Sequence, residues 1–329
     1  MPTVGGDEMT HADLERVAER LAAVLPGQVE RDAPFGALTT WRVGGPAAVL
    51  VRLEHVDDLA ALAASMSPEV PRAVLGRGSN LLVADVGFSG VVITLGAAFE
   101  VVEISTDRVV AGGATPLPVL ARQCAAAGRS GLGFYVGIPG SVGGAVRMNA
   151  GGHGRDTSEV LVEARIADLD GDATPHSRSV ESLGLGYRHS ALGPSDVIVE
   201  AVFEVGEGSP EHLRAEIGEI VRWRTEHQPG GANAGSVFKN PPGDSAARLI
   251  DQQCGLRGMR VGGAVVSEKH ANFIQADVGA SAADVHQLIR AVRDRVDQEA
   301  GVLLEVEVHQ LGFDGDDGPP DSSTDQWNP

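Results

Sequence analysis

Hydrophobic and polar positions near the start of the chain follow a helical period. Val17 and Leu21 are spaced to share one face of a helix over 10–25, because residues three or four positions apart lie on the same side of an α-helix. Thr10 and Asp13 can each bond a free backbone amide of the first turn, which marks the start of a helix. The sequence therefore predicts an amphipathic helix here.

Short apolar runs separated by turn residues follow, and this pattern favours strands. We expect strands at 47–53 and 72–76, with a helix at 55–65 between them. A helix at 117–127 and a glycine-rich stretch at 128–154 come later. Between 76 and 113, four further runs are predicted strands: LLVAD, VVITL, VVEIS and RVVAGG.

Two longer strand patterns, VLVEARIADLD and DVIVEAVFEV, flank a loop that carries the residues YRHS. A helix at 210–227 is predicted next, because Ser209 is a good N-cap and Pro210 suits the first helical position. The segment PGGANAG then breaks the helical pattern. We therefore place a domain boundary near residue 228.

The last third of the chain predicts helices at 245–254 and 281–299 and a terminal strand, GVLLEVEV, at 301–308. Alternate side chains of an extended chain face opposite sides. The aliphatic residues of this run would face a core, and the opposite side would carry Glu305 and Glu307. For Glu305 we expect a solvent-facing edge.

These patterns divide the chain into four predicted parts with an α+β fold. They are an N-terminal helical segment at 1–29, a strand-rich region at 30–228, a C-terminal domain at 229–313 and a disordered acidic tail at 314–329. The tail has acidic residues, Pro, Gly and Ser but no basic residue, a composition that does not bury enough apolar surface to fold.

The charge balance excludes several functions. The 329 residues include 26 basic and 45 acidic side chains, a formal net charge of −19. Such a chain repels nucleic acid and anionic membranes, so we expect neither as a partner. No apolar run approaches the roughly 20 residues of a membrane-spanning helix, and the acidic start is unlike a signal peptide. Cys124 and Cys254 cannot build a cysteine-rich metal site, so we expect a cytoplasmic protein without a metal.

The first candidate for ligand binding is Gly76-Arg77-Gly78-Ser79-Asn80, directly after a predicted strand. Glycine lets backbone N–H groups approach a phosphate, and Ser and Asn add hydrogen-bond donors. The segment lacks the third glycine of a Rossmann fingerprint and the GK[ST] of a P-loop. By itself, a tight turn between two strands explains it equally well.

The second candidate is GIPGSVGGAVRMNAGG at 137–152, in which six residues are glycine. A flexible linker is the alternative, but the aliphatic residues of this segment would have no use in a linker. Glycine-rich buried backbone commonly lies against a planar or charged group. Two such segments in one strand-rich region suggest a dinucleotide that lies across both.

Two other segments carry polar side chains of chemical interest. Arg188 in YRHS could polarise a carbonyl or pair with a carboxylate, although a surface ion pair is the usual role. Ser236 and Lys239 lie in GSVFKNP, which has neither a GxSxG nor an SxxK pattern and so does not indicate a serine hydrolase. Only Lys239 and Lys269 are lysines, so the compact ammonium of Lys239 is either required there or kept by chance.

Taken together, eight segments in order resemble the UDP-N-acetylenolpyruvoylglucosamine reductases (the MurB family), flavoenzymes of bacterial cell-wall precursor synthesis. The resemblance covers nearly everything from residue 30 to 313. The matching segments are TTWRVGGPA (39–47), GRGSNLLVAD (76–85), GIPGSVGGAVRMNAG (137–151), GYRHS (186–190), GSVFKNP (235–241), ARLIDQQCGLRG (247–258), VSEKHANF (266–273) and GVLLEVEVHQLG (301–312).

The resemblance implies an FAD-binding fold of the vanillyl-alcohol-oxidase (PCMH) type in two α+β lobes over 30–228, with a substrate-binding domain over 229–313. It implies that NADPH reduces FAD and that UDP-N-acetylenolpyruvoylglucosamine is then reduced to UDP-N-acetylmuramate. Several oxidases of this fold attach FAD through His or Cys near the first glycine segment. Ser79 occupies that segment here, which favours FAD held without a covalent bond.

The family pattern also implies roles for individual residues. Its catalytic positions fall on Arg188, Ser236 and Glu307. The implied cofactor-binding positions are Gly76, Arg77, Gly78, Ser79, Asn80, Gly112, Gly137, Pro139, Gly140, Ser141, Gly143, Asn149 and Gly151. The implied substrate-binding positions are Tyr187, Arg224, Lys239, Asn240, Lys269 and Asn272.

The residue types suit that reaction. Hydride addition to the terminal carbon of the enol ether leaves negative charge beside the substrate carboxylate, which Arg188 can stabilise. Glu307 is useful there if it is protonated, so we expect burial to raise its pKa. Ser236 can give a proton to the neighbouring carbon.

The chain departs from the family pattern at a few positions. Many relatives carry MNAGAYG, whereas Gly152 and His153 follow NAG here. Many relatives also have an Asn shortly after HANF, where this chain has Gln275 and Ala276. These departures affect fine contacts with the substrate. The alternatives are another flavin oxidoreductase of the same fold, acting on a sugar or alcohol, and a non-catalytic flavin- or nucleotide-binding relative. The intact set of catalytic residue types favours the reductase.

Overall fold

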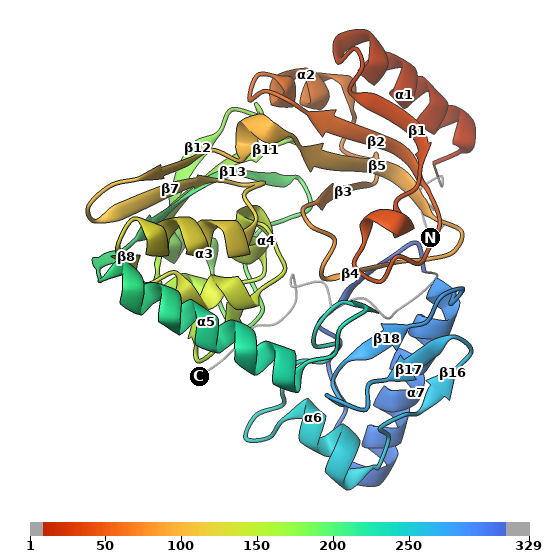
Figure 1. Cartoon of the computed structure of the whole chain (residues 1–329). Coiled ribbons are helices and arrows are strands. Elements are labelled where there is room, and N and C mark those ends of the chain that lie inside the picture. Colours follow the sequence, from red (N-terminus) through yellow and green to blue (C-terminus); the bar gives the residue numbers. More distant parts are fainter. Residues whose placement is uncertain (1–8, 314–329) are drawn as a thin grey trace.

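The structure, a computed structural model, describes residues 9–313 as three groups of helices and strands that meet at the centre of the molecule (Figure 1). The predicted tail at 314–329 and residues 1–8 lie outside the described residues. No helix in the described part is long and apolar enough to cross a membrane.

The first group is a four-stranded sheet, ordered β1-β2-β5-β3, with two helices on it. The helix predicted at 10–25 is confirmed: Thr10 and Asp13 form a capping box, and Leu14, Val17 and Leu21 are buried. These helix residues pack in one core with the sheet. The elements are α1 (His11–Val24), β1 (Val29–Ala33), β2 (Ala47–Leu53), α2 (Asp58–Ser65), β3 (Arg72–Leu75) and β5 (Phe88–Leu95).

The second group is a five-stranded sheet, ordered β12-β11-β13-β7-β6, covered by three helices. Leu213 and Ile217 of α5 are buried in its core. The predicted helix at 210–227 is confirmed with Ser209 as its N-cap. The elements are β6 (Val102–Ile104), β7 (Arg108–Gly112), α3 (Leu117–Ala126), α4 (Val142–Arg147), β11 (Leu161–Asp168), β12 (His176–Ser179), β13 (Asp196–Glu204) and α5 (Pro210–His227).

The third group packs α7 against a small four-stranded sheet, ordered β15-β18-β17-β16. Trp41, from the chain between β1 and β2, is buried in this core, and its indole Nε1 donates to Ile274 O at 2.8 Å. The elements are β15 (Ala232–Asn233), α6 (Ala246–Arg248), a π-helical turn (Leu249–Gln253), β16 (Arg260–Val261), β17 (Ala264–Val266), β18 (Ile274–Ala276) and α7 (Ala282–Ala300).

The remaining elements are short. Three two-stranded sheets pair β19 with β4, β14 with β8 and β10 with β9. Their strands are β4 (Leu81–Val83), β8 (Arg129–Ser130), β9 (Gly151–Gly152), β10 (Arg155–Asp156), β14 (Gly206–Glu207) and β19 (His309–Leu311). The 3₁₀ turns are Gly36–Leu38, Ala97–Phe99, Gly133–Gly137, Thr157–Glu159 and Val180–Leu183.

The terminal strand predicted at 301–308 is wrong. The chain there is irregular, with one isolated bridge from Val306 to Phe238, and the strand begins only at His309. The predicted alternation nevertheless holds, because Leu304, Val306 and Val308 are buried. The alternation of apolar and polar residues showed which side chains of this segment face the core. It could not show whether a neighbouring strand pairs with the segment along its length.

Candidate active site

A large cleft lies where the first two groups of elements meet. Its volume is about 990 Å³. Of the predicted cofactor-binding residues, Gly76, Arg77, Ser141 and Gly143 line it. Other lining residues were not predicted, and they include Thr39, Thr40, Arg42, Gly113, Ala114, Gly144 and Arg147. Arg42 and both threonines belong to the segment TTWRVGGPA, which matches the family pattern. The polar residues of that segment could therefore have been predicted to line the cleft.

The two glycine-rich segments touch each other, as a dinucleotide laid across both would require. A Cβ added to Gly76 would overlap Ser141 Oγ, and a Cβ on Gly140 would lie 3.8 Å from Ser79 Oγ. Gly78 has φ +61°, and a Cβ there would overlap the backbone of Leu38. Glycine thus allows the two segments to pack closely beside the cleft, whose wall includes Gly76, Ser141 and Gly143.

Two of the predicted cofactor residues, Gly112 and Asn149, make close contacts inside the protein. Gly112 does not line the cleft, and a Cβ there would collide with the Phe99 backbone, whereas Gly113 does line it. Asn149 is buried, and its amide donates to Gly186 O at 2.9 Å and accepts from Ser158 N at 2.9 Å. These contacts speak against a cofactor contact from the Asn149 side chain.

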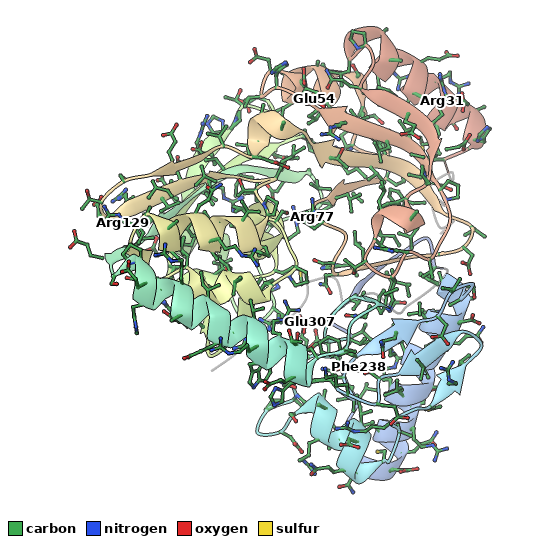
Figure 2. The ribbon with its side chains drawn as sticks, in the orientation of Figure 1. Arg31, Glu54, Arg77, Arg129, Phe238 and Glu307 are labelled. Atoms are coloured by element: carbon green, nitrogen blue, oxygen red, sulfur yellow. The ribbon has the colours of Figure 1, made fainter. Side chains whose placement is uncertain are left out.

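Arg188 and Glu307 form an ion pair at the centre of the molecule. Arg188 Nε lies 2.9 Å from Glu307 Oε1, and both side chains are mostly buried. Arg188 Nη2 also donates to Gly151 O at 3.0 Å, in the second glycine-rich segment. Arg188 has φ +54°, a left-handed conformation that is costly for a residue other than glycine. Figure 2 shows Glu307 and Arg77 near the centre and Arg31 and Arg129 at the periphery.

Burial raises the pKa of Glu307, and the attraction of Arg188 opposes that rise only in part. The expected direction of this pKa is therefore confirmed. The backbone of Glu307 is tied to the first glycine-rich segment, because Asn80 Nδ2 donates to Glu307 O at 3.0 Å and His309 N donates to Asn80 O at 3.1 Å. The predicted cofactor segment thus helps to place the predicted catalytic carboxyl.

Ser236 lies on a segment that runs beside Glu307. Glu307 N donates to Val237 O at 2.8 Å, and Lys239 N donates to Glu305 O at 2.9 Å. Within residues 9–313, the hydroxyl of Ser236 makes no hydrogen bond and the residue is half-buried. The structure therefore brings all three predicted catalytic residues into neighbouring segments and leaves this hydroxyl available to a substrate.

Three predicted substrate residues lie beside the three predicted catalytic residues. Tyr187 is 54% exposed, with the guanidinium of Arg188 5.2 Å from its ring centroid. Asn240 N donates to Tyr187 Oη at 3.4 Å, and Lys239 Nζ pairs with Glu305 at 2.6 Å. Glu305 is exposed, as expected for a solvent-facing edge, and it also holds this ammonium.

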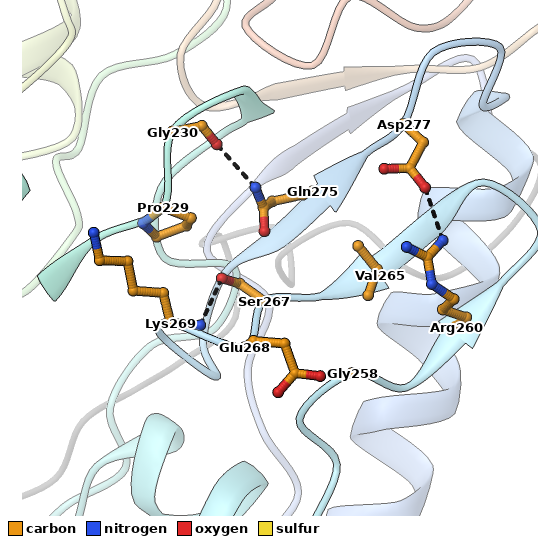
Figure 3. Close-up of a pocket in the computed structure, with 10 residues that line it drawn as sticks. All are labelled: Pro229, Gly230, Gly258, Arg260, Val265, Ser267, Glu268, Lys269, Gln275 and Asp277. Atoms are coloured by element: carbon orange, nitrogen blue, oxygen red, sulfur yellow. Dashed lines mark hydrogen bonds and ion pairs between the residues drawn. The ribbon is translucent and has the colours of Figure 1, made fainter.

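Arg224 and Lys269 lie further along α5 and on the third group. Arg224 Nε donates to Gln228 Oε1 at 2.7 Å, and burial lowers the pKa of this arginine. Lys269 lines a second hollow of about 460 Å³, together with Ser267 and Gln275 (Figure 3). Its Nζ donates to Thr225 O, which connects the third group to α5.

Asn272, a predicted substrate residue, is bonded inside the protein. It is 3% exposed, and its amide is bonded on both atoms to the backbone of Phe238. This burial speaks against a direct substrate contact. The described residues contain no cluster of side chains suited to hold a metal ion.

Known proteins match this chain along most of its length. Residues 227–311 match the model of the UDP-N-acetylenolpyruvoylglucosamine reductase C-terminal domain, and residues 47–174 match an FAD binding domain. The UDP-N-acetylenolpyruvoylglucosamine reductase of Methylorubrum populi is 44% identical over 297 residues, which cover 89% of this chain and 95% of that protein. The protein of the same name from Acidiphilium cryptum is 42% identical over 295 residues, or 88% of this chain and 94% of the other.

A solved structure agrees with these sequence relatives. The crystal structure of UDP-N-acetylenolpyruvylglucosamine reductase (MurB) from Thermus caldophilus matches with a TM-score of 0.75 and 39% identity, over 86% of this chain and 99% of that one. The predicted α+β fold, an FAD-binding part followed by a C-terminal domain, is confirmed. By identity and by coverage, the chain belongs to the UDP-N-acetylenolpyruvoylglucosamine reductase family.

Proposed function

We propose that this protein reduces UDP-N-acetylenolpyruvoylglucosamine to UDP-N-acetylmuramate in the cytoplasm, with NADPH as reductant and non-covalent FAD as cofactor. The product is a precursor of peptidoglycan, so the activity would serve cell-wall growth, cell shape and division. The observation that carries the proposal is the Arg188–Glu307 pair beside Ser236, bonded to both glycine-rich segments of the cofactor cleft.

Bound FAD would supply the hydride for the enolpyruvyl double bond. Residues Gly76–Asn80 and Gly137–Gly151 would hold FAD with backbone and side-chain donors, and Thr40, Arg42 and Gly113 would add to them. The chain's net charge of −19 opposes polyanionic ligands, so these local donors have to offset it.

Each catalytic residue has a distinct role in this proposal. Arg188 stabilises the negative charge that spreads into the substrate carboxylate, and its left-handed backbone aims it from a fixed loop. Glu307, with its raised pKa, donates a hydrogen bond to the same developing charge when protonated. Ser236 gives its proton to the carbon that carries the ether oxygen, and water restores the proton.

The substrate residues would meet the diphosphate and sugar. Tyr187, Lys239 and Asn240 lie beside the catalytic residues. Arg224 on α5 and Lys269, whose Nζ donates to Thr225 O of that helix, offer two further cations. In this proposal residues 30–228 bind the cofactor and residues 229–313 bind the substrate.

The test is NADPH consumption by the purified protein. Without oxygen, absorbance at the NADPH wavelength should fall beyond one equivalent per flavin only when the enolpyruvyl UDP-sugar is present, and the product should be heavier by two hydrogen atoms. NADPH consumption that needs a sugar or alcohol other than this substrate would refute the proposal.

A further inference from the structure

The side chain of Asn272 forms a closed pair of hydrogen bonds with one residue of the catalytic segment. Phe238 N donates to Asn272 Oδ1 at 2.9 Å, and Asn272 Nδ2 donates to Phe238 O at 2.8 Å. The amide thus imitates the pairing that a neighbouring strand would give. The backbone adds a third contact, because Val237 N donates to Asn272 O at 2.9 Å.

These bonds lie on one side of the segment that carries Ser236. The other side is held by Glu305 and Glu307, through Lys239 N and Val237 O. Ser236 itself makes no hydrogen bond within the described residues. The position of its hydroxyl therefore depends on contacts of its neighbours. These are the two rows that begin at Val237 and the bond from Gly235 N to Asn233 Oδ1 at 3.0 Å.

We propose that Asn272 is a positioning residue for proton transfer: it holds the segment at Phe238 so that the Ser236 hydroxyl meets the reacting carbon. This role rests on the proposed function. The amide is the group that fits, because it offers one donor and one acceptor at the spacing of a peptide. An alanine leaves two buried backbone groups of Phe238 unpaired, which destabilises this arrangement of the segment. The segment then shifts to reach other partners.

The effect on the reaction is selective. A misplacement of about 1 Å at a catalytic group can slow a step by around 10²-fold. The reduction of the flavin by NADPH involves no proton from Ser236, whereas the reduction of the enolpyruvyl substrate does. Loss of the Asn272 amide therefore affects the second half-reaction and leaves the first nearly intact.

The experiment measures both half-reactions anaerobically by stopped-flow absorbance of the flavin, in Asn272→Ala and in Asn272→Ser. We expect flavin reduction by NADPH within about twofold of wild type. Reoxidation by the enolpyruvyl UDP-sugar should slow by roughly 10–100-fold in the alanine variant. It should slow less in the serine variant, whose shorter hydroxyl still offers the Phe238 backbone a polar partner and supports folding if the alanine variant is unstable.

A double substitution separates positioning from general damage. In a Ser236→Ala background, Asn272→Ala should slow reoxidation by less than about threefold, because the hydroxyl that Asn272 positions is already absent. The control is Val292→Ala, which removes buried carbon from α7 in the same core and leaves the Asn272 amide in place; it should lower the melting temperature without a selective loss of reoxidation.

Two results would overturn the proposal. One is equal slowing of both half-reactions by Asn272→Ala. The other is a further loss in the Ser236→Ala background as large as in the wild type. If the wild-type flavin is not reoxidised by the enolpyruvyl UDP-sugar at all, the proposed function fails, and this role fails with it.

Discussion

Arg188 Nε lies 2.9 Å from Glu307 Oε1, and each partner is tied to a different segment of the cofactor cleft. The guanidinium also donates to Gly151 O, and the Glu307 carbonyl accepts from Asn80 Nδ2. A cofactor in the cleft and a substrate at this ion pair would therefore be placed by the same two stretches of backbone. The following predictions test that arrangement.

The raised pKa of Glu307 predicts a pH dependence of stability in Glu307→Gln. Because burial raises the folded-state pKa above the ordinary value of 4.5, this carboxyl supports folding fully below that value and loses the support as pH rises through its folded pKa. Glutamine has no proton to lose. The stability of the variant relative to wild type should therefore increase with pH above 4.5 and then level off.

Urea unfolding at a series of pH values measures this difference directly. Residues that titrate equally in both proteins cancel. A difference that falls as pH rises would mean that Arg188 lowers the pKa of this carboxyl more than burial raises it.

Arg188→Lys should lower kcat by about 10²-fold or more, the range for loss of one preorganised donor. Lysine keeps the charge, but a single ammonium cannot hold Glu307 and Gly151 O together as the planar guanidinium does. Steady-state kinetics with the enolpyruvyl UDP-sugar give the value. Activity within threefold of wild type would show that charge alone suffices at this position.

Flavin should be held without a covalent bond, and Gly76→Ala should weaken that binding at least tenfold. The added methyl group would overlap Ser141 Oγ in the cleft. Acid precipitation should leave the yellow colour in the supernatant, and flavin fluorescence titration should report the affinity.

Gly152→Ala is the matched control for this glycine. A Cβ there meets only Ile138 Cγ1, at an ordinary 3.9 Å, so flavin affinity should be unchanged. Colour that stays with the protein pellet would contradict non-covalent binding, and equal affinities in both variants would contradict the role of Gly76.

Trp41→Phe should destabilise the protein by roughly 1–3 kcal/mol, because it leaves the buried Ile274 carbonyl without its donor. Trp41 is 1% exposed, and it joins the region before β2 to the core around α7. Thermal unfolding measures the loss. Trp223→Phe, at a residue 43% exposed on α5, should change the melting temperature by less than a degree or two. Equal effects would contradict the account.

Local patterns in the sequence predicted much of the fold. The capping box at Thr10 and the N-cap at Ser209 mark helix starts that the structure confirms. The terminal strand was wrong because pairing depends on distant neighbours that a local pattern does not contain. The same limit hid Trp41, whose partner Ile274 lies 233 residues away in the sequence.

The candidate site was predictable in its chemistry and less so in its supporting contacts. Motif resemblance named Arg188, Ser236 and Glu307, and the structure places them in adjoining segments. Resemblance to the family did not distinguish residues that face a ligand from residues that support those ligand-facing residues. The amides of Asn272 and Asn149, for example, are both bonded to backbone groups inside the protein.

The most direct test of the account is the effect of Ser236→Ala on the two half-reactions, followed anaerobically by flavin absorbance. The change removes one oxygen atom that makes no hydrogen bond within the described residues, so the fold should survive. We predict that NADPH reduces the flavin at close to the wild-type rate and that reoxidation by the enolpyruvyl UDP-sugar slows by about 10²–10⁴-fold, the usual range for loss of a general acid. Equal slowing of both steps would show that Ser236 positions ligands, and it would contradict its role as proton donor.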